Sequence, residues 1–371
     1  MESASIFLSA GDPSGDTASA RLVSALKERR PQLNFFGLGG HKLRELGQHQ
    51  LAEPDDLAVL GFWEVARRYL FFRRLFSSCI RQIKASRPSV VVLVDYPGFN
   101  LRLARKIKPL GIPVVYYISP QVWAWGGKRL DDIRNLVDTM LLILPFERDF
   151  YRSSAVSHEF VGHYLLEDIP DEFISSTVPD RAALTLGLLP GSRPQEIKKM
   201  LPPMLEAASA FNKKFSGRTV VAGVSNKFDY RPYLEKYSDD NIEIVIDRSR
   251  EVIYGSTLVL TASGTATLET AIIGRPMVVV YKTGWITYHI ARRLVRLDRI
   301  ALANLVLGET VVPELIQRQA SPDNMLSALE NYVDDEKYRV GVIDKLNRVP
   351  GLLGGKGASA RAAEVIAGYL P

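Results

Sequence analysis

The sequence predicts an α/β protein built from two doubly wound parallel-sheet domains. Short apolar runs alternate with amphipathic stretches, an order typical of buried parallel strands joined by helices. This rhythm occurs once in each half of the chain, and a break with acidic residues and prolines separates the halves near residues 162–179. With 371 residues, 46% of them hydrophobic, the chain is long enough for two domains of ordinary size.

The first half begins with an apolar run at residues 6–10, which the turn Gly11-Asp12-Pro13-Ser14-Gly15-Asp16 connects to a helical pattern at 17–29. The β-branched run at 90–94 is continuous, as expected for a strand buried on both faces. The predicted strands of this half are residues 6–10, 34–38, 90–94, 114–118 and 140–144.

The second half repeats the pattern. We expect domains at residues 1–168 and 180–350. A C-terminal segment, 351–371, contains an Ala-rich helix that crosses back to the first domain or to a partner subunit, and the chain could form a homodimer. Two such domains place a reaction in the crevice at the carboxyl ends of their strands. The predicted strands of this half are residues 184–188, 219–224, 242–246, 257–261 and 276–281.

Composition narrows the functional class. The single cysteine, Cys79, allows no intrachain disulfide and no Cys-based metal site, which fits a reducing compartment. The histidines lack metal-ligand spacing, so no metal or other cofactor is expected. The first apolar run is too short for a signal peptide or a membrane span. A net charge of +6 favours anionic partners such as nucleotides or phospholipid surfaces, whereas no nucleic-acid-binding module is recognisable.

Two turns in the second half, residues 189–197 and 263–269, each follow an apolar run and open a predicted helix. A helix N-terminus attracts phosphate, and small residues let a ligand approach the backbone. Arg193 could grip a diphosphate in a bidentate way, and Glu269 could accept hydrogen bonds from ribose hydroxyls. Either turn alone could be an ordinary capped connection, but together they predict a sugar-nucleotide cradle. Its candidate residues are Gly191, Ser192, Arg193, Ser263, Gly264, Thr265, Ala266, Thr267 and Glu269.

Polar residues also follow strands of the first domain. Asp95 directly follows the run at 90–94 and could be a general base or the cap of a turn or helix. In the turn that contains Ser14 and Gly15, Asp12 and Asp16 could bind acceptor hydroxyls or cap a helix. The stretch from Ser119 to Trp125 follows the run at 114–118, so Ser119 and Trp123 could line the site or pack in the interior.

Basic and large apolar residues interleave over residues 62–76. This pattern suits a membrane interface or a lipid chain. The alternative is a core-facing helix whose arginines extend to solvent. The candidate membrane- or acyl-contacting residues are Arg67, Arg68, Phe71, Phe72, Arg73, Arg74 and Phe76.

Taken together, these motifs resemble the lipid-A-disaccharide synthase family over almost the whole chain. The resemblance is carried by Gly-Asp-Pro-Ser-Gly-Asp at 11–16, Asp-Tyr-Pro-Gly-Phe-Asn at 95–100, Tyr-Tyr-Ile-Ser-Pro-Gln-Val-Trp-Ala-Trp at 116–125, Val-Gly-His at 161–163, Leu-Pro-Gly-Ser-Arg at 189–193, Ser-Gly-Thr-Ala-Thr-Leu-Glu at 263–269 and the stretch 304–317 that begins with Asn304.

The resemblance implies the GT-B fold, in which two Rossmann-like domains face each other across a cleft. It implies an inverting, metal-independent transfer from UDP-2,3-diacylglucosamine to 2,3-diacylglucosamine 1-phosphate (lipid X), at the cytoplasmic face of the inner membrane. The family's essential aspartate falls on Asp95 and its conserved arginine on Arg193. Asn304 is then expected at the UDP site and His163 near the acceptor. The alternatives are another GT-B enzyme, such as a UDP-N-acetylglucosamine 2-epimerase, and a non-catalytic nucleotide- or lipid-binding protein.

Overall fold

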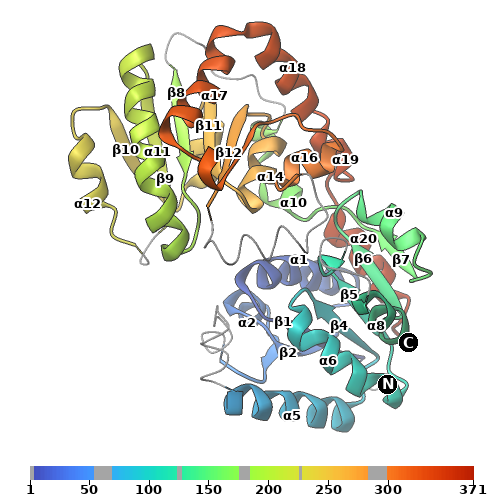
Figure 1. Ribbon diagram of the computed structural model, residues 1–371. Helices are drawn as coiled ribbons and strands as arrows, with labels where there is room; N and C mark the ends of the chain where they lie inside the picture. Colours follow the sequence, from blue (N-terminus) through green and yellow to red (C-terminus); the bar gives the residue numbers. More distant parts are fainter. Residues whose placement is uncertain (1–3, 54–68, 123–127, 175–183, 225–227, 283–298) are drawn as a thin grey trace. The chain divides into compact units, whose positions relative to one another are not determined.

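The structure is a computed structural model that describes residues 4–53, 69–122, 128–174, 184–224, 228–282 and 299–371 (Figure 1). It divides into two compact units. Unit 1 comprises Met1–Tyr164 and Gly354–Pro371, and unit 2 comprises Leu165–Leu353. The chain thus enters unit 2 at Leu165 and returns to unit 1 at Gly354. Within the described ranges, no helix has the length and apolar character needed to cross a bilayer.

Unit 1 contains a seven-stranded parallel sheet with the strand order β3-β2-β1-β4-β5-β6-β7. All the strands predicted in this half are present, and the continuous β-branched runs form its buried centre. The sequence did not predict β3 and β7, which are short strands at the two edges. The strands are β1 (Ser5–Ala10), β2 (Asn34–Leu38), β3 (His49–Gln50), β4 (Val90–Val94), β5 (Val114–Tyr117), β6 (Thr139–Leu142) and β7 (His158–Phe160).

Unit 2 contains a six-stranded parallel sheet with the order β10-β9-β8-β11-β12-β13. It repeats the connectivity of unit 1, and only the three-residue edge strand β13 was not predicted. The strands are β8 (Thr185–Leu189), β9 (Arg218–Gly223), β10 (Ile242–Ile246), β11 (Leu258–Ala262), β12 (Met277–Tyr281) and β13 (Glu314–Ile316).

Helices connect the strands, as parallel pairing requires. In unit 1 they are α1 (Pro13–Arg29), α2 (His41–Glu45), α5 (Tyr69–Ser86), α6 (Pro97–Ile107), α8 (Lys128–Leu136), α9 (Glu147–Arg152) and α20 (Ala358–Ala367). In unit 2 they are α10 (Leu165–Asp168), α11 (Pro194–Phe215), α12 (Arg231–Leu234), α13 (Ser249–Tyr254), α14 (Thr265–Ile272), α16 (Leu302–Leu307), α17 (Pro322–Asp334), α18 (Glu336–Leu346) and α19 (Val349–Leu352).

The C-terminal helix α20 packs against α1 (Figure 1). Polar contacts also fasten this end of the chain to unit 1. The Arg361 guanidinium donates to the carbonyl of Val161 at 2.8 Å, and the hydroxyls of Tyr369 and Thr139 lie 2.6 Å apart. The C-terminal segment is thus packed against unit 1 through α1 and through these hydrogen bonds.

The order of strands reverses direction between β1 and β4 in unit 1, and between β8 and β11 in unit 2. Ligands of open parallel sheets bind at such switch points, just beyond the carboxyl ends of the two central strands. The turns after β1 and β4 carry Asp12 and Asp95, and those after β8 and β11 carry Ser192 and Ser263. Each unit therefore presents its candidate site where its topology favours one.

Candidate functional site

The turn after β8 brings the backbone close to a charged pair. Gly191 has φ +112°, a conformation that L side chains rarely adopt, and a Cβ there would lie 3.1 Å from Oε2 of Glu196. Arg193 precedes α11 as its N-cap in extended backbone. Its exposed guanidinium contacts the Glu196 carboxylate at 3.2 Å. The turn thus places an exposed cation at the positive end of a long helix.

The turn after β11 leads into α14. Gly264 has φ +155° and ψ −161°, and nothing lies within 4 Å of where its Cβ would be, so the backbone conformation alone favours glycine. Thr265 and Ala266 form the first turn of the helix, and Glu269 follows one turn later with only 13% of its side chain exposed.

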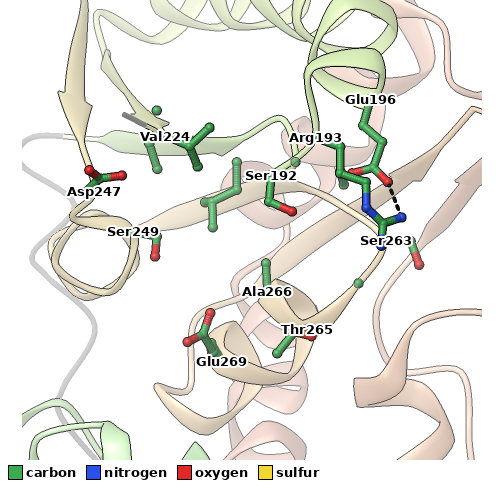
Figure 2. A pocket seen from close by; sticks show the side chains of 16 residues that line it. Ser192, Arg193, Glu196, Val224, Asp247, Ser249, Ser263, Thr265, Ala266 and Glu269 are labelled. Carbon is green, nitrogen blue, oxygen red and sulfur yellow. Dashed lines mark hydrogen bonds and ion pairs between the residues drawn. The ribbon is translucent and has the colours of Figure 1, made fainter. Parts of the chain in front are cut away.

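These two turns form opposite walls of one pocket, as Figure 2 shows. Ala222, Gly223 and Val224, at the end of β9, and Asp247 and Ser249, after β10, line the rest of it. Eight of the predicted nucleotide-binding residues line this pocket. They are Gly191, Ser192, Arg193, Ser263, Gly264, Thr265, Ala266 and Glu269.

Two predicted nucleotide-binding residues do not line it. Thr267 is fully buried, and its hydroxyl donates to the carbonyl of Gly264 at 2.8 Å. Asn304 is fully buried too, because its amide bonds the backbone of Val312 at 2.9 and 3.0 Å and the Glu314 carboxylate at 2.8 Å. Thr267 therefore stabilises the start of α14, and Asn304 fixes the chain beside β13.

Glu269 has a cationic partner, Arg250, that does not line the pocket. The Nε of Arg250 donates to its Oε1 at 2.8 Å, and Nη1 of the same guanidinium donates to the carbonyl of Asp168 at 2.8 Å. Arg250 lies in α13 and Asp168 ends α10, so the contact joins three helices.

In unit 1, Asp95 occupies a strained turn at the end of β4. Asp95 and Tyr96 have φ of +44° and +48°, which non-glycine residues seldom adopt. The Asn100 amide donates to the Asp95 carbonyl at 2.8 Å, and the Tyr116 hydroxyl donates to the same carbonyl at 2.5 Å. Ser9 in turn donates to Asn100 at 2.7 Å. The surrounding strands thus hold the Asp95 backbone in an unfavourable conformation, a pattern that recurs at functional sites.

The carboxyl group of Asp95 has a raised pKa. Burial raises its pKa to about 6, the negative charge of Asp12 contributes in the same direction, and a hydrogen bond from the Tyr96 backbone opposes both. A carboxylate with this pKa is a much stronger base than a solvated one, yet it remains mostly ionised at neutral pH. It can therefore accept a proton from a hydroxyl as that hydroxyl attacks.

The acidic residues of the turn after β1 have separate roles. Asp12 caps α1 by accepting from the Gly15 amide at 2.9 Å and from the Ser14 hydroxyl at 2.5 Å. Asp16 is buried and accepts from the amides of Gly40 and Lys42 at 2.7 and 3.1 Å. The capping alternative therefore holds for Asp12, whose charge also raises the pKa of Asp95, whereas Asp16 binds backbone amides at the start of α2.

The remaining acceptor-side candidates are buried or lie outside the described residues. The Ser119 hydroxyl is buried 2.7 Å from the hydroxyl of Tyr151. His163 is buried against Tyr164, with ring centroids 4.9 Å apart, and burial lowers its pKa to about 3. It is therefore neutral at physiological pH. Trp123 lies outside the described residues.

The basic aromatic stretch is described from Tyr69 onward, as α5; Arg67 and Arg68 lie outside the described residues. Phe71, Phe72 and Phe76 are half-buried and pack against the hydrophobic core of unit 1. Leu70, in contrast, is 64% exposed, and Arg73 and Arg74 are exposed. The helix thus combines the two alternatives: its phenylalanines contribute to the core, and its first turns present a leucine and two cations to the surface.

Sequence reasoning missed the pocket residues Glu196, Asp247 and Ser249, and it also missed Arg250, which binds Glu269. A signal for the last three was present, because Asp-Arg-Ser-Arg at 247–250 directly follows a predicted strand, as both recognised turns do. Carboxyl ends of adjacent parallel strands meet at one edge of a sheet, so the turn after 242–246 also belonged among the candidates.

The chain is similar to known proteins along its whole length. The profile of the family described as Lipid-A-disaccharide synthetase matches residues 6–352. A lipid-A-disaccharide synthase of Anaeromyxobacter dehalogenans is 41% identical over 98% of this chain and 97% of its own length. A lipid-A-disaccharide synthase of Myxococcus xanthus is 39% identical over 99% of this chain and 97% of its own.

Solved structures share the fold at low identity. A putative UDP-N-acetylglucosamine 2-epimerase from Listeria monocytogenes superposes with a TM-score of 0.67 at 13% identity, covering 99% of this chain and 96% of its own. The calicheamicin glycosyltransferase CalG4 gives 0.62 at 17% identity, covering 100% of this chain and 98% of its own. These likenesses concern the fold, and they confirm the predicted GT-B class with its two Rossmann-like domains.

Proposed function

The chain belongs to the lipid-A-disaccharide synthase family, whose members are glycosyltransferases, and from this premise we propose that Asp95 and Arg193 carry its chemistry. The family's reaction joins UDP-2,3-diacylglucosamine to lipid X and gives a β-1,6-linked disaccharide 1-phosphate and UDP. The alternatives are not favoured, because the epimerase likeness rests on 13% identity whereas synthases match at up to 41%.

In this proposal the pocket of unit 2 binds the UDP portion of the donor. The small residues and helix starts of its two turns accept the diphosphate, and Arg193 exchanges its contact with Glu196 for the phosphate oxygens. Glu269 accepts hydrogen bonds from the ribose hydroxyls. A guanidinium that is exposed and paired with one surface carboxylate can change partners at little cost, because such ion pairs contribute only about 0–1 kcal/mol.

Asp95 acts as the general base. It takes the proton of the acceptor 6-hydroxyl while that oxygen attacks the anomeric carbon of the donor from the face opposite UDP. The bond between the anomeric carbon and the diphosphate oxygen breaks, its electron pair leaves with UDP, and the anomeric configuration inverts. Negative charge grows on the diphosphate, and Arg193 with the two helix N-termini stabilises it.

We also propose that unit 1 meets the lipid substrates at the inner-membrane surface through the start of α5. The exposed Leu70 can enter the interface, and Arg73 and Arg74 can contact anionic headgroups. The chain's net charge of +6 acts in the same direction.

The observation that carries the proposal is the half-buried carboxylate of Asp95, with its pKa raised to about 6, on a strained turn at the switch point of unit 1. The test incubates the purified protein with UDP-2,3-diacylglucosamine and lipid X and follows both products by mass spectrometry. We expect one tetraacyl disaccharide 1-phosphate for each UDP released. Release of UDP with free diacylglucosamine, or with a C2 epimer, would contradict it.

A further inference from the structure

Glu269 is the one acidic residue of α14, and its two carboxylate oxygens are in different situations. Oε1 accepts from Arg250 at 2.8 Å. Within the described part of the chain, no hydrogen bond reaches Oε2. The side chain lines the pocket (Figure 2), so Arg250 holds one oxygen while the other can accept a hydrogen bond from a ligand.

Arg250 is itself held from a second side. Its Nη1 donates to the carbonyl of Asp168 at 2.8 Å, and its Nη2 lies 3.8 Å from the Asp168 carboxylate. The Asp168 and Glu269 side chains are only 8% and 13% exposed, and that of Arg250 is 30% exposed. A planar guanidinium fixed at two edges has little freedom to rotate, so it fixes the direction of the carboxylate bound to it.

The segment that follows Asp168 also packs against α13. Phe173, five residues after Asp168, stacks on Tyr254 of α13 with ring centroids 4.2 Å apart and an interplanar angle of 9°. Arg250 lies one turn earlier in that same helix. The carbonyl and the guanidinium are thus kept together by packing as well as by their own hydrogen bond.

We propose that Arg250 is a positioning residue for nucleotide recognition: it orients Glu269 so that Oε2 accepts from the ribose hydroxyls of the donor. The positive charge of Arg250 also neutralises the largely buried Glu269 carboxylate, since an unpaired charge at this position would be destabilising. This inference rests on the proposed binding of UDP in the pocket. It adds a residue outside the pocket lining whose effect is confined to the sugar of the nucleotide.

The test compares two probes, UDP and 2′,3′-dideoxy-UDP, by titration calorimetry on the full chain. In the wild type we expect UDP to bind roughly ten to a hundred times more tightly, the range for hydrogen bonds to a charged group. In Arg250→Met that ratio should fall towards the ratio of Glu269→Gln, while the affinity for the dideoxy probe stays within about threefold. Arg250→Lys, which keeps one charged donor, should recover part of the ratio.

Arg248→Met is the matched control, because Arg248 lies two residues away and its side chain forms, among the residues described, only an exposed contact with Glu251 at 3.4 Å. It should keep the wild-type ratio. A wild-type ratio in Arg250→Met, or an equal loss of both probes, would overturn the proposal. A wild-type protein that binds UDP without discriminating against the dideoxy probe would overturn it as well, with the proposed function intact. If the wild type binds neither probe, the proposed function itself fails.

Discussion

The side-chain amide of Asn100 donates to the main-chain carbonyl of Asp95 at 2.8 Å. The same amide also reaches the carbonyls of Val94 and Ser9, at 3.1 and 3.3 Å, so one buried side chain fastens the ends of β4 and β1 together. Left-handed backbone at a non-glycine residue costs about 1–3 kcal/mol. Because this network opposes that cost, the Asp95 backbone that carries the carboxylate is held at the switch point of the sheet.

The pH dependence of the reaction should show the ionisation of the Asp95 carboxyl group. Its pKa is raised to about 6, and only the ionised form accepts a proton, so kcat/KM should fall as the pH drops below about 6 and level off above it. The acceptor phosphate titrates in a similar range, so the informative reading is the shift in a variant. Asp12→Asn removes a negative charge that raises the Asp95 pKa, and the acid limb should move to lower pH.

Asp149→Asn is the control for this shift, because Asp149 is a highly exposed carboxylate of unit 1 that pairs with Arg152. Its acid limb should coincide with that of the wild type. An acid limb that stays in place in Asp12→Asn would show that the phosphate or another group controls the profile.

Arg193→Ala should weaken UDP binding roughly ten to a hundredfold, because a charge-assisted hydrogen bond to the diphosphate is lost. It should also slow the chemical step, since that bond strengthens as the leaving group departs. Calorimetry and single-turnover kinetics measure the two effects. Arg231→Ala, which removes an exposed arginine paired with Asp229, should change neither. Unchanged affinity and rate in Arg193→Ala would make Arg193 a surface residue only.

Activity should survive removal of divalent cations. In the proposed mechanism, Arg193 and the N-termini of α11 and α14 supply positive charge to the departing diphosphate, so the protein itself stabilises the leaving group. The measurement is the turnover rate in excess EDTA, compared with the rate in added magnesium. A rate that collapses in EDTA and returns with magnesium or manganese would require a metal in the mechanism.

Two substitutions near the start of α5 should distinguish membrane contact from core packing. Leu70→Ser removes a side chain that is 64% exposed, so vesicle binding should fall and the apparent KM for lipid X should rise with little change in Tm. Phe72→Ser should instead lower the stability, by up to about 3 kcal/mol, because a fully buried Phe contributes about 3–5 kcal/mol and this ring is half-buried. Sedimentation with anionic vesicles and thermal melts decide. If Leu70→Ser sediments like the wild type, the membrane contact lies elsewhere.

The central strands and the strand-to-helix turns were predictable, because continuous β-branched runs are typical of buried strands and clusters of glycine and serine are typical of turns. The edge strands β3 and β7 were missed, since two or three residues carry no periodicity. The partners of Asn304 could not be predicted either: an amide has the same chemistry towards a ligand as towards a backbone, and in the fold it contacts Val312 and Glu314.

Asp95 and Arg250 show what no local pattern provides. The raised pKa of Asp95 depends on burial and on Asp12, which lies more than eighty positions earlier in the chain. The role of Arg250 depends on Asp168 and Glu269, which belong to different helices. Sequence spacing can identify a carboxylate as a candidate site residue, whereas the charges and burial around it depend on tertiary contacts.

The most direct test of the account is the initial rate of disaccharide 1-phosphate formation from UDP-2,3-diacylglucosamine and lipid X, measured for the wild type and for Asp95→Asn. An amide of nearly the same shape cannot accept the proton, and loss of a general base costs on the order of 10²–10⁴-fold. We expect a rate reduced by that factor in a variant that keeps the wild-type Tm and UDP affinity. Near-normal turnover in Asp95→Asn would contradict the account.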